Sequence, residues 1–365
     1  MPIKIAAIRL HRYRLPLRAE WSTAAGGFTV REGWLLRLTG ADGHNAYGDC
    51  APLPASGTET PERAEAALHA YIHSLVGRQA DDAFEALDDL GDGTPATRCA
   101  VETALLDLLA QVAGLPLADY LRGSDCRADV AVNAALGQLT QDSGRAMLAA
   151  HAESFPVVKF KVGIASPAAE IAHLHRLAER IPAGLLLRLD ANRAWDEAQA
   201  TGFLAACAGL PIDMFEEPLA DPQTDALRRL QAICAFPLAL DESLPDFDPD
   251  ILLAAPPVRR LVLKPPCLGG LLPALALARR AADAGLECVV TGSVDSACGV
   301  LAAGHLAAAL GNGLAHGLAT SSWLAEDAGR PPTIADGRLK RHGAPGLGFV
   351  PWPDLVFSDG ALPPP

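Results

Sequence analysis

Three of the chain's five lysines lie within or directly after apolar segments that are typical of buried strands. Lys159 and Lys161 are two positions apart in the segment 157–162, so both side chains would point to the same face of a strand. Lys264 follows the apolar segment 261–263. Lysine, unlike arginine, has a pKa that can fall far enough for the side chain to act as a base. We therefore interpret Lys161 and Lys264 as candidate acid–base residues.

Three carboxylates, Asp190, Glu216 and Asp241, each come at the end of a further apolar segment between these lysines. If the segments are neighbouring parallel strands, the three carboxylates lie close together and repel one another at neutral pH. Oxygen ligands without histidine or cysteine favour Mg²⁺, with Mn²⁺ as a substitute, over zinc. A helix cap or a strand-end ion pair would explain any one of these acids equally well. Three acids in phase, flanked by lysines, favour a metal site.

A metal between two lysines is suited to removing a proton next to a carboxylate. A nearby cation and a second ammonium disfavour the charged form of a lysine, so that it can take a proton. A divalent cation stabilises the enediolate that this step produces. Lys159 either supports Lys161 by charge repulsion or forms a buried ion pair with a neighbouring strand. Asn192 and Glu242, close to two of the carboxylates, are expected to support the metal site.

The spacing of these residues predicts alternating strands and helices. Positions 161, 190, 216, 241 and 264 recur every 23 to 29 residues, which accommodates one strand, one helix and two loops. Continuous apolar segments, rather than alternating ones, indicate strands buried on both faces. Further segments at 130–134, 287–291 and 314–316 bring the number to eight. This predicts an α/β fold of the (β/α)8 barrel type, with the active site at the C-terminal ends of the strands.

The first part of the chain has a different pattern. Residues 3–14, 31–39 and 45–51 are predicted to form an antiparallel meander, followed by helices at 60–76 and 97–112. We expect an α+β capping domain at 1–128, a catalytic barrel domain at 129–324, and a tail at 325–365 that packs back on the capping domain and completes it. The small-residue loop 20–33 is either a mobile lid or a surface hairpin.

The composition limits the class of protein. A chain of 365 residues, half of them hydrophobic, is long enough for two domains with a large core. The formal net charge of −13, with no basic stripe, argues against nucleic acid and anionic membranes as partners. A small-molecule carboxylate is the expected partner, and a homo-oligomer remains open. The first residues contain no signal sequence, so we expect a cytoplasmic protein. Eight cysteines without a Cys-x-x-Cys pair are expected to be reduced thiols.

Five motifs resemble, in order and spacing, those of the enolase superfamily, muconate-lactonizing-enzyme subgroup. They are Lys159-x-Lys161, Leu189-Asp190-Ala191-Asn192, Phe215-Glu216-Glu217-Pro218, Asp241-Glu242-Ser243 and Leu263-Lys264-Pro265. Residues 100–123 also resemble the capping domain of that family, so the resemblance covers nearly the whole chain. It implies a modified (β/α)7β barrel with an α+β cap, a Mg²⁺ held by the three carboxylates, and a pair of acid–base lysines.

Within the subgroup, the segments 263–270, 291–296 and 315–318 most resemble o-succinylbenzoate synthases of menaquinone synthesis. This resemblance implies dehydration of a cyclohexadiene carboxylate. An N-acyl or N-succinyl amino acid racemase, a muconate-type cycloisomerase and, more remotely, a non-catalytic barrel remain alternatives. The Asp-x-Asp of dipeptide epimerases is missing after the eighth strand, where Ala-Thr-Ser-Ser-Trp stands at 319–323.

The candidate substrate contacts are Trp21, Thr291, Gly292 and Ser293. Trp21 belongs to the small-residue loop 20–33, whose place in the capping domain suits a cover over the site. Gly292 and Ser293 precede a helix and can offer backbone N–H groups to a substrate carboxylate. An ordinary helix cap is the alternative interpretation for this pair.

Overall fold

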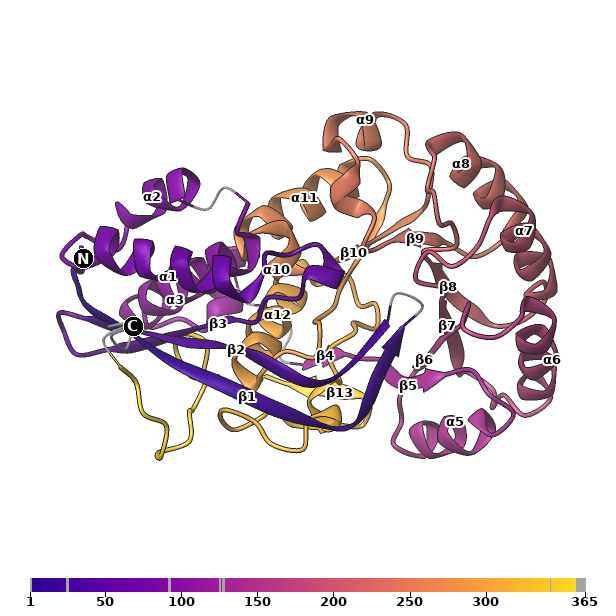
Figure 1. Ribbon diagram of the computed structural model, residues 1–365, viewed down its shortest axis with the longest axis horizontal. Coiled ribbons are helices and arrows are strands. Elements are labelled where there is room, and N and C mark those ends of the chain that lie inside the picture. The colour runs from indigo at the N-terminus through magenta and orange to yellow at the C-terminus, as the bar shows by residue number, and fades with distance from the viewer. Residues whose placement is uncertain are drawn as a thin grey trace.

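A curled parallel sheet, with helices on its outer face, adjoins a second unit that is built on a three-stranded antiparallel sheet (Figure 1). The computed structural model describes residues 2–23, 26–90, 93–124, 126, 129–341 and 343–358. The parallel sheet has the strand order β11-β10-β9-β8-β7-β6-β5. Its strands are β5 (Ala134–Gln138), β6 (Val157–Lys161), β7 (Leu186–Asp190), β8 (Ile212–Glu216), β9 (Leu238–Leu240), β10 (Arg260–Leu263) and β11 (Glu287–Val290).

Helices connect these strands and cover the outer face of the sheet (Figure 1). They are α5 (Ser143–Ala152), α6 (Pro167–Ala178), α7 (Glu197–Ala206), α8 (Thr224–Ile233), α9 (Pro249–Ala254), α10 (Pro265–Leu268), α11 (Leu271–Asp283) and α12 (Ala297–Leu310). Local sequence explains their starts: Asp196 and Gln199 form a capping box at α7, and Pro167 follows the capping Ser166 at α6. Side chains such as Leu187 and Leu189 are fully buried, because both faces of the sheet are covered.

The barrel closes through an irregular segment in place of a regular eighth strand. The N–H of His316 donates to the carbonyl of Ala131 (2.8 Å), and the N–H of Asn133 donates to the carbonyl of His316 (2.9 Å). On the other side, the N–H of Gly317 donates to the carbonyl of Val290 (2.8 Å). Residues 315–317 therefore lie between β11 and the chain leading into β5. The fold is the modified (β/α)7β barrel with a capping domain that the motifs implied.

The prediction of the first barrel strand was wrong by about four residues. Residues 130–134 were expected to open the barrel, but the strand that pairs with β6 is β5, which begins at Ala134. Residues Asp129–Ala131 form β4, which pairs with β13 (Arg338–Lys340) of the tail. Both segments are apolar, and only the pairing with the tail, more than 200 residues later, decides between them.

The second unit combines the antiparallel sheet with four helices. Its strands are β1 (Ile5–Thr23), β2 (Gly26–Gly40) and β3 (Asn45–Cys50), and its helices are α1 (Pro61–Leu75), α2 (Ala83–Leu90), α3 (Pro95–Val112) and α4 (Leu117–Arg122). Helices α1 and α3 confirm the predicted segments. Helices α2 and α4, of 8 and 6 residues, were not predicted because they are too short to show a period. Helix α3 contacts β3 on one side and α10 of the barrel on another.

The segment 20–33 belongs to a long β-hairpin and is not a loop. Strands β1 and β2 pair over nearly their whole length, and the pairing includes Trp21 with Phe28. The predicted strand ended at residue 14 because Pro16 lacks an N–H for the sheet. The structure accommodates this proline with a register shift between Pro16 and Trp21. Ala24 and Ala25, at the centre of the predicted lid, lie outside the described residues.

The tail runs back along both units. Besides β13 it contributes β12 (Ile334–Ala335), and Ser358 exchanges two backbone hydrogen bonds with Leu10 of β1. The short helix η3 (Ser321–Trp323) lies directly before the tail. Because β13 pairs with β4, the tail also joins the barrel side, and the division at residues 128 and 324 stays a proposal. The eight cysteines, all in the described part, are free thiols. No helix in the described ranges has the length and apolar character to cross a membrane.

Candidate active site

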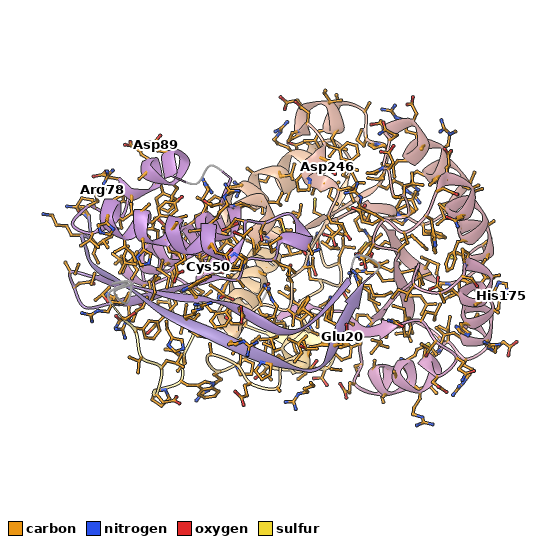
Figure 2. The ribbon with its side chains drawn as sticks, in the orientation of Figure 1. Glu20, Cys50, Arg78, Asp89, His175 and Asp246 are labelled. Carbon is orange, nitrogen blue, oxygen red and sulfur yellow. The ribbon has the colours of Figure 1, made fainter. Side chains whose placement is uncertain are left out.

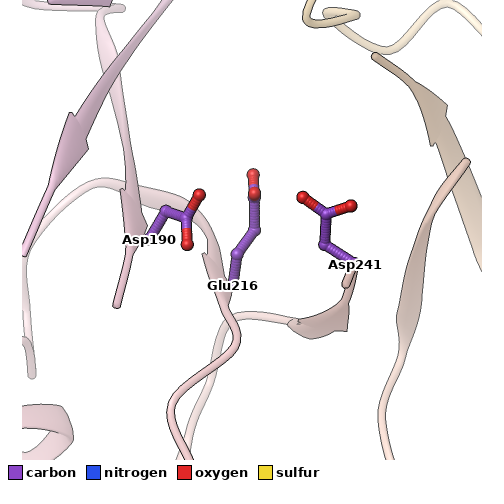
Figure 3. Close-up of side chains that lie close together, drawn as sticks. All are labelled: Asp190, Glu216 and Asp241. Atoms are coloured by element: carbon purple, nitrogen blue, oxygen red, sulfur yellow. The ribbon is translucent and has the colours of Figure 1, made fainter. Parts of the chain in front are cut away.

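The three predicted carboxylates converge at the C-terminal ends of neighbouring strands (Figure 3). Asp190 ends β7, Glu216 ends β8 and Asp241 directly follows β9. Asp190 and Glu216 are partners in the parallel register, which brings their side chains to the same level. One oxygen of each of the three lies within 4.8 Å of the others, and all three side chains are buried.

The three predicted lysines surround this carboxylate cluster. Lys161 Nζ lies 2.5 Å from Asp190 Oδ2, and Lys264 Nζ lies 2.8 Å from Asp241 Oδ2. The two lysines therefore approach the cluster from opposite ends. Lys159 Nζ lies 2.8 Å from Asp190 Oδ2 and also pairs with Glu216. Of the two interpretations of Lys159, this geometry favours the buried ion pair.

Burial and charge act in opposite directions on these groups. Burial by itself would lower the pKa of Lys159, but the carboxylates of Asp190 and Glu216 outweigh it and raise the pKa. Burial likewise lowers the pKa of Lys264, and Asp241 and Glu242 reverse the effect and raise it well above its usual value. Burial raises the pKa of Glu216 to about 7 despite the neighbouring Lys159. The ion pairs of the three lysines hold the three acidic side chains together.

The donor set fits a hard divalent cation. The cluster contains carboxylate oxygens only, and Asp241 Oδ1 is buried without a hydrogen-bond partner among the described residues. An unpartnered buried carboxylate oxygen is unfavourable unless something binds it. Oxygen donors without sulfur or nitrogen suit Mg²⁺ or Mn²⁺. The residues present therefore fit the predicted metal, with Asp190, Glu216 and Asp241 as its ligands.

A layer of hydrogen bonds beneath the carboxylates fixes the loop that carries Asp241. Glu217 accepts hydrogen bonds from the N–H of Asp241 (2.5 Å), the N–H of Ser243 (3.0 Å) and the hydroxyl of Ser243 (2.7 Å). Its backbone has φ +46°, a left-handed conformation that is unfavourable for a side chain of this size. Burial raises the pKa of Glu217 to about 8. Sequence reasoning missed this role, although Glu217 stands within the Glu216-Glu217-Pro218 motif.

The two predicted supporting residues bind each other across the mouth of the barrel. Asn192 Nδ2 donates to Glu242 Oε1 (2.6 Å), and the N–H of Asn192 donates to Asp190 Oδ1 (2.9 Å). Asn192 too has a left-handed backbone, with φ +45°. The pair therefore joins the loop that follows Asp190 at the end of β7 to the loop after β9 that carries Asp241.

The hairpin and the barrel mouth enclose a cavity of about 440 Å³ above this cluster. Lys161, Lys264 and Asp241 line one part of it, and the apolar side chains of Trp21, Phe28 and Trp323 line another. Trp21 and Trp323 meet edge to face, with ring centroids 4.8 Å apart. Glu20, on the same hairpin (Figure 2), also borders the cavity. A concave, partly apolar cavity with convergent polar groups is typical of an active site.

Thr291, Gly292 and Ser293 line the cavity as predicted, but the backbone N–H groups of Gly292 and Ser293 are not free. Gly292 N donates to the carbonyl of Gly317 (3.4 Å), and Ser293 N donates to Asp295 Oδ2 (3.0 Å). Both N–H groups have partners within the protein, and their contact with a substrate carboxylate stays a prediction. Helix α12 begins only at Ala297, so Asp295 lies in the turn before the helix, where its side chain accepts the N–H of Ser293.

The turn between this wall and α12 is strained. Val294 is buried and has φ +58°, which is rare for a β-branched residue. Strain of this kind persists only where the surrounding contacts hold it, and it is frequent near active sites. Here the hydrogen bond from Ser293 to Asp295, and the bonds from the N–H and hydroxyl of Ser296 to Asp49, hold the two ends of the turn.

The capping domain also fixes the segment that follows Lys264. Arg98 of α3 donates to the carbonyl of Gly269 (2.5 Å), and Glu102 accepts the N–H of Leu272 (3.0 Å). Gly270 has φ +151°, and a Cβ atom there would lie 2.2 Å from Glu102 Oε2. Glycine is required at this position because the buried Glu102 approaches the backbone closely. The Gly269-Gly270 pair is visible in the sequence, but its contact with Glu102 is not.

Comparisons with known proteins assign both parts of the chain to one family. Residues 142–355 match the family model described as enolase C-terminal domain-like, and residues 5–92 match the MenC N-terminal domain. The chain is 30% identical to the L-Lys-D/L-Arg epimerase of Methylococcus capsulatus over 361 residues, or 96% of this chain and 100% of the epimerase. It is 29% identical to the o-succinylbenzoate synthase of Yersinia pseudotuberculosis over 327 residues, or 88% of this chain and 92% of the synthase.

A solved structure supports the same relationship. The dipeptide epimerase from Methylococcus capsulatus, complexed with Mg and the dipeptide L-Arg-D-Lys, matches with a TM-score of 0.85 at 30% identity. The match covers 95% of this chain and 99% of that one. Sequence motifs, fold and relatives agree, and the chain is an enzyme that belongs to the enolase superfamily.

Proposed function

We propose that the protein catalyses the Mg²⁺-dependent dehydration of a cyclohexadiene carboxylate to o-succinylbenzoate. The observation that carries this proposal is the arrangement of two lysines at opposite ends of one buried carboxylate cluster, at a cavity between the hairpin and the barrel. Proton removal next to a carboxylate needs a base on one side and positive charge around the oxygens. Both requirements are met by residues of this chain.

Each residue has a distinct role in this proposal. Lys161 takes the proton from the carbon next to the carboxylate, and the C–O bond to the leaving hydroxyl then breaks. The same proton returns to the departing hydroxide, so that water leaves and the ring becomes aromatic. Lys264 stays charged and stabilises the negative charge on the carboxylate oxygens. A bound Mg²⁺ would supply further positive charge at those oxygens.

Lys159 does not act as a base in this proposal. Its Nζ lies between Asp190 and Glu216 and pairs with both, whereas Lys161 pairs with Asp190 alone. Its role is to hold two of the metal ligands in position. The lower position of Lys159 on the strand is consistent with this role, because Lys161 is the residue nearer the C-terminal end of β6.

Racemisation of an N-succinyl or dipeptide substrate is the second candidate. Two lysines on opposite sides of the substrate could exchange protons on opposite faces, and several relatives of the chain carry names of epimerases. Against a dipeptide, the closing segment after β11 reads Gly-Leu-Ala-Thr at 317–320 and offers no carboxylate for an ammonium group. This ranks a dipeptide below an N-succinyl substrate. We rank dehydration above both because residues 5–92 match the MenC N-terminal domain.

Incubation with each substrate in separate reactions tests the ranking. Purified protein with Mg²⁺ should convert the cyclohexadiene acid to o-succinylbenzoate, followed by the ultraviolet absorbance of the substrate and product. Parallel reactions with an N-succinylamino acid and with a dipeptide should show slower loss of optical activity. Faster racemisation of either compound would remove dehydration from first place.

A further inference from the structure

Asn133 borders the cavity at the residue before β5. Its backbone N–H binds the closing segment at His316, and β5 lies three strands from β8 in the order of the sheet. The side chain is only 2% exposed, yet it borders the cavity. A buried polar side chain on a cavity wall requires a hydrogen-bond partner for each of its polar atoms.

Arg188 determines which end of the Asn133 amide faces the cavity. Arg188 Nη1 lies 2.9 Å from the Asn133 side chain, and a guanidinium group can only donate hydrogen bonds. The atom that receives this bond must be Oδ1, so Nδ2 points elsewhere. Arg188 is itself buried and held by Asp213 (2.6 Å) and by the carbonyl of Ala315 (2.8 Å). The orientation of Asn133 is therefore fixed.

Among the other polar groups of this wall, several are already bound or exposed, and the hydroxyl of Thr320 is buried without a partner in the described part. Thr291 donates its hydroxyl to the carbonyl of Gly317 (3.1 Å), and Trp323 donates its indole N–H to the carbonyl of Ala135 (3.3 Å). Gln138 carries the second amide of this wall but is exposed. Among the described hydrogen bonds, none uses Asn133 Nδ2, so it is a fixed donor without a protein acceptor.

The carboxylates that border the cavity also limit which substrate groups can bind there. The carboxylates that border it are Glu20 on the hairpin and Asp241 and Glu242 beside the metal site. Within the described part, none stands on the wall formed by β5, the closing segment and the turn after β11. A substrate group that reaches this wall therefore meets hydrogen-bond donors and no carboxylate of the cavity lining.

We infer that Asn133 Nδ2 donates a hydrogen bond to an oxygen at the end of the substrate remote from the reacting carboxylate, and so selects a carbonyl or carboxylate there over an ammonium group. The inference rests on the proposed function, which places the reacting carboxylate beside Lys161. A succinyl chain has such an oxygen, and the free amine of a dipeptide does not. Asn133 is thus a specificity-determining residue that Arg188 positions.

Asn133→Asp tests the inference with the smallest change of shape. The aspartate still accepts from Arg188, so folding should be preserved, but the donor is lost. KM for the cyclohexadiene acid should rise about ten- to a hundred-fold with a smaller change in kcat, as expected for a lost hydrogen bond to a charged group. Asn133→Ala, which removes the donor without adding a charge, should change KM in the same direction.

Asn45→Asp is the matched control. Asn45 is exposed on β3 and accepts from Thr39 (2.8 Å), so the variant adds the same charge outside the cavity and should leave KM unchanged. Unchanged KM in both Asn133 variants, with thermal unfolding like wild type, would overturn the inference and leave the proposed function standing. Racemisation of an N-succinylamino acid with the same rise in KM would overturn the proposed function alone. A wild-type enzyme active only on dipeptides, or on none of these substrates, would contradict both.

Discussion

Lys161 and Lys264 lie at the two ends of one carboxylate cluster, but they have different roles in the proposed reaction: Lys161 transfers a proton, and Lys264 only needs to stay charged. Arginine keeps the positive charge and cannot give up its proton at accessible pH. Lys264→Arg should therefore retain measurable dehydration, whereas Lys161→Arg should lose about 10²–10⁴-fold in kcat, the usual contribution of an acid–base group. Steady-state kinetics of the two variants, each checked for folding by circular dichroism, measures the difference. Equal losses in both variants would favour the racemase, which needs two exchanging amines.

The sequence predicted the residues of this centre better than their hydrogen bonds. The positions of Asp190, Glu216 and Asp241 follow from the strand period, because the parallel strands end at one level. The role of Asn133 depends on Arg188, which lies on another strand, and no local pattern indicates that contact. The partners of the N–H groups of Gly292 and Ser293, the carbonyl of Gly317 and the side chain of Asp295, were not predicted, because a pattern of small residues does not reveal such contacts.

At the scale of elements, the joint between α3 and α11 sets the position of the segment after Lys264. Gly270→Ala should destabilise the fold by about 2–4 kcal/mol, from backbone strain together with the overlap with Glu102. Gly285→Ala, at the other end of α11, is the control. It has φ +76° and nothing within 4 Å of a new Cβ, so it should cost only about 1–2 kcal/mol. Urea unfolding of both variants compares them, and equal costs would show that Glu102 does not restrict position 270.

The same joint makes stability depend on pH. Burial raises the pKa of Glu102 to about 7, whereas the unfolded chain releases this proton near about pH 4.3. Between these values the folded protein binds more protons than the unfolded chain, so the contribution of Glu102 to stability falls as pH rises. Glu102→Gln should remove this penalty, and its free energy of unfolding relative to wild type should rise by roughly 3 kcal/mol from pH 4 to 8. A difference in the free energy of unfolding between the two proteins that stays constant from pH 4 to 8, measured by urea unfolding, would contradict the assignment.

Element boundaries were predictable only where one chain segment determined them. Helices α1 and α3 begin close to the predicted residues because Pro61 and Pro95 occupy their first positions. The first barrel strand was predicted too early in the chain, because residues 129–131 form β4, which pairs with the distant β13. The first strand of the hairpin was predicted to end at residue 14, before Pro16. In the structure a register shift allows the strand to continue to Thr23.

At the scale of the whole molecule, the cavity exists only because the hairpin of one unit lies over the barrel of the other. The three metal ligands lie together only in the folded protein, so a metal that binds them should stabilise the fold. Mg²⁺ at 100 times its dissociation constant should stabilise the protein by about 2.7 kcal/mol, seen as a rise in Tm that EDTA reverses. Asp241→Asn should lose this rise, because it removes one of three ligands. A Tm unaffected by Mg²⁺ in the wild type would argue against the metal site.

The central claim is that this centre eliminates water from a cyclohexadiene acid faster than it exchanges the α-proton of an amino acid. Reactions in ²H₂O with Mg²⁺ measure both rates: formation of o-succinylbenzoate, and uptake of deuterium at the α-carbon of each enantiomer of an N-succinylamino acid. We predict that kcat/KM for dehydration exceeds that for exchange, and that EDTA abolishes both. Deuterium exchange from both enantiomers at a rate equal to or above that of dehydration would contradict the account.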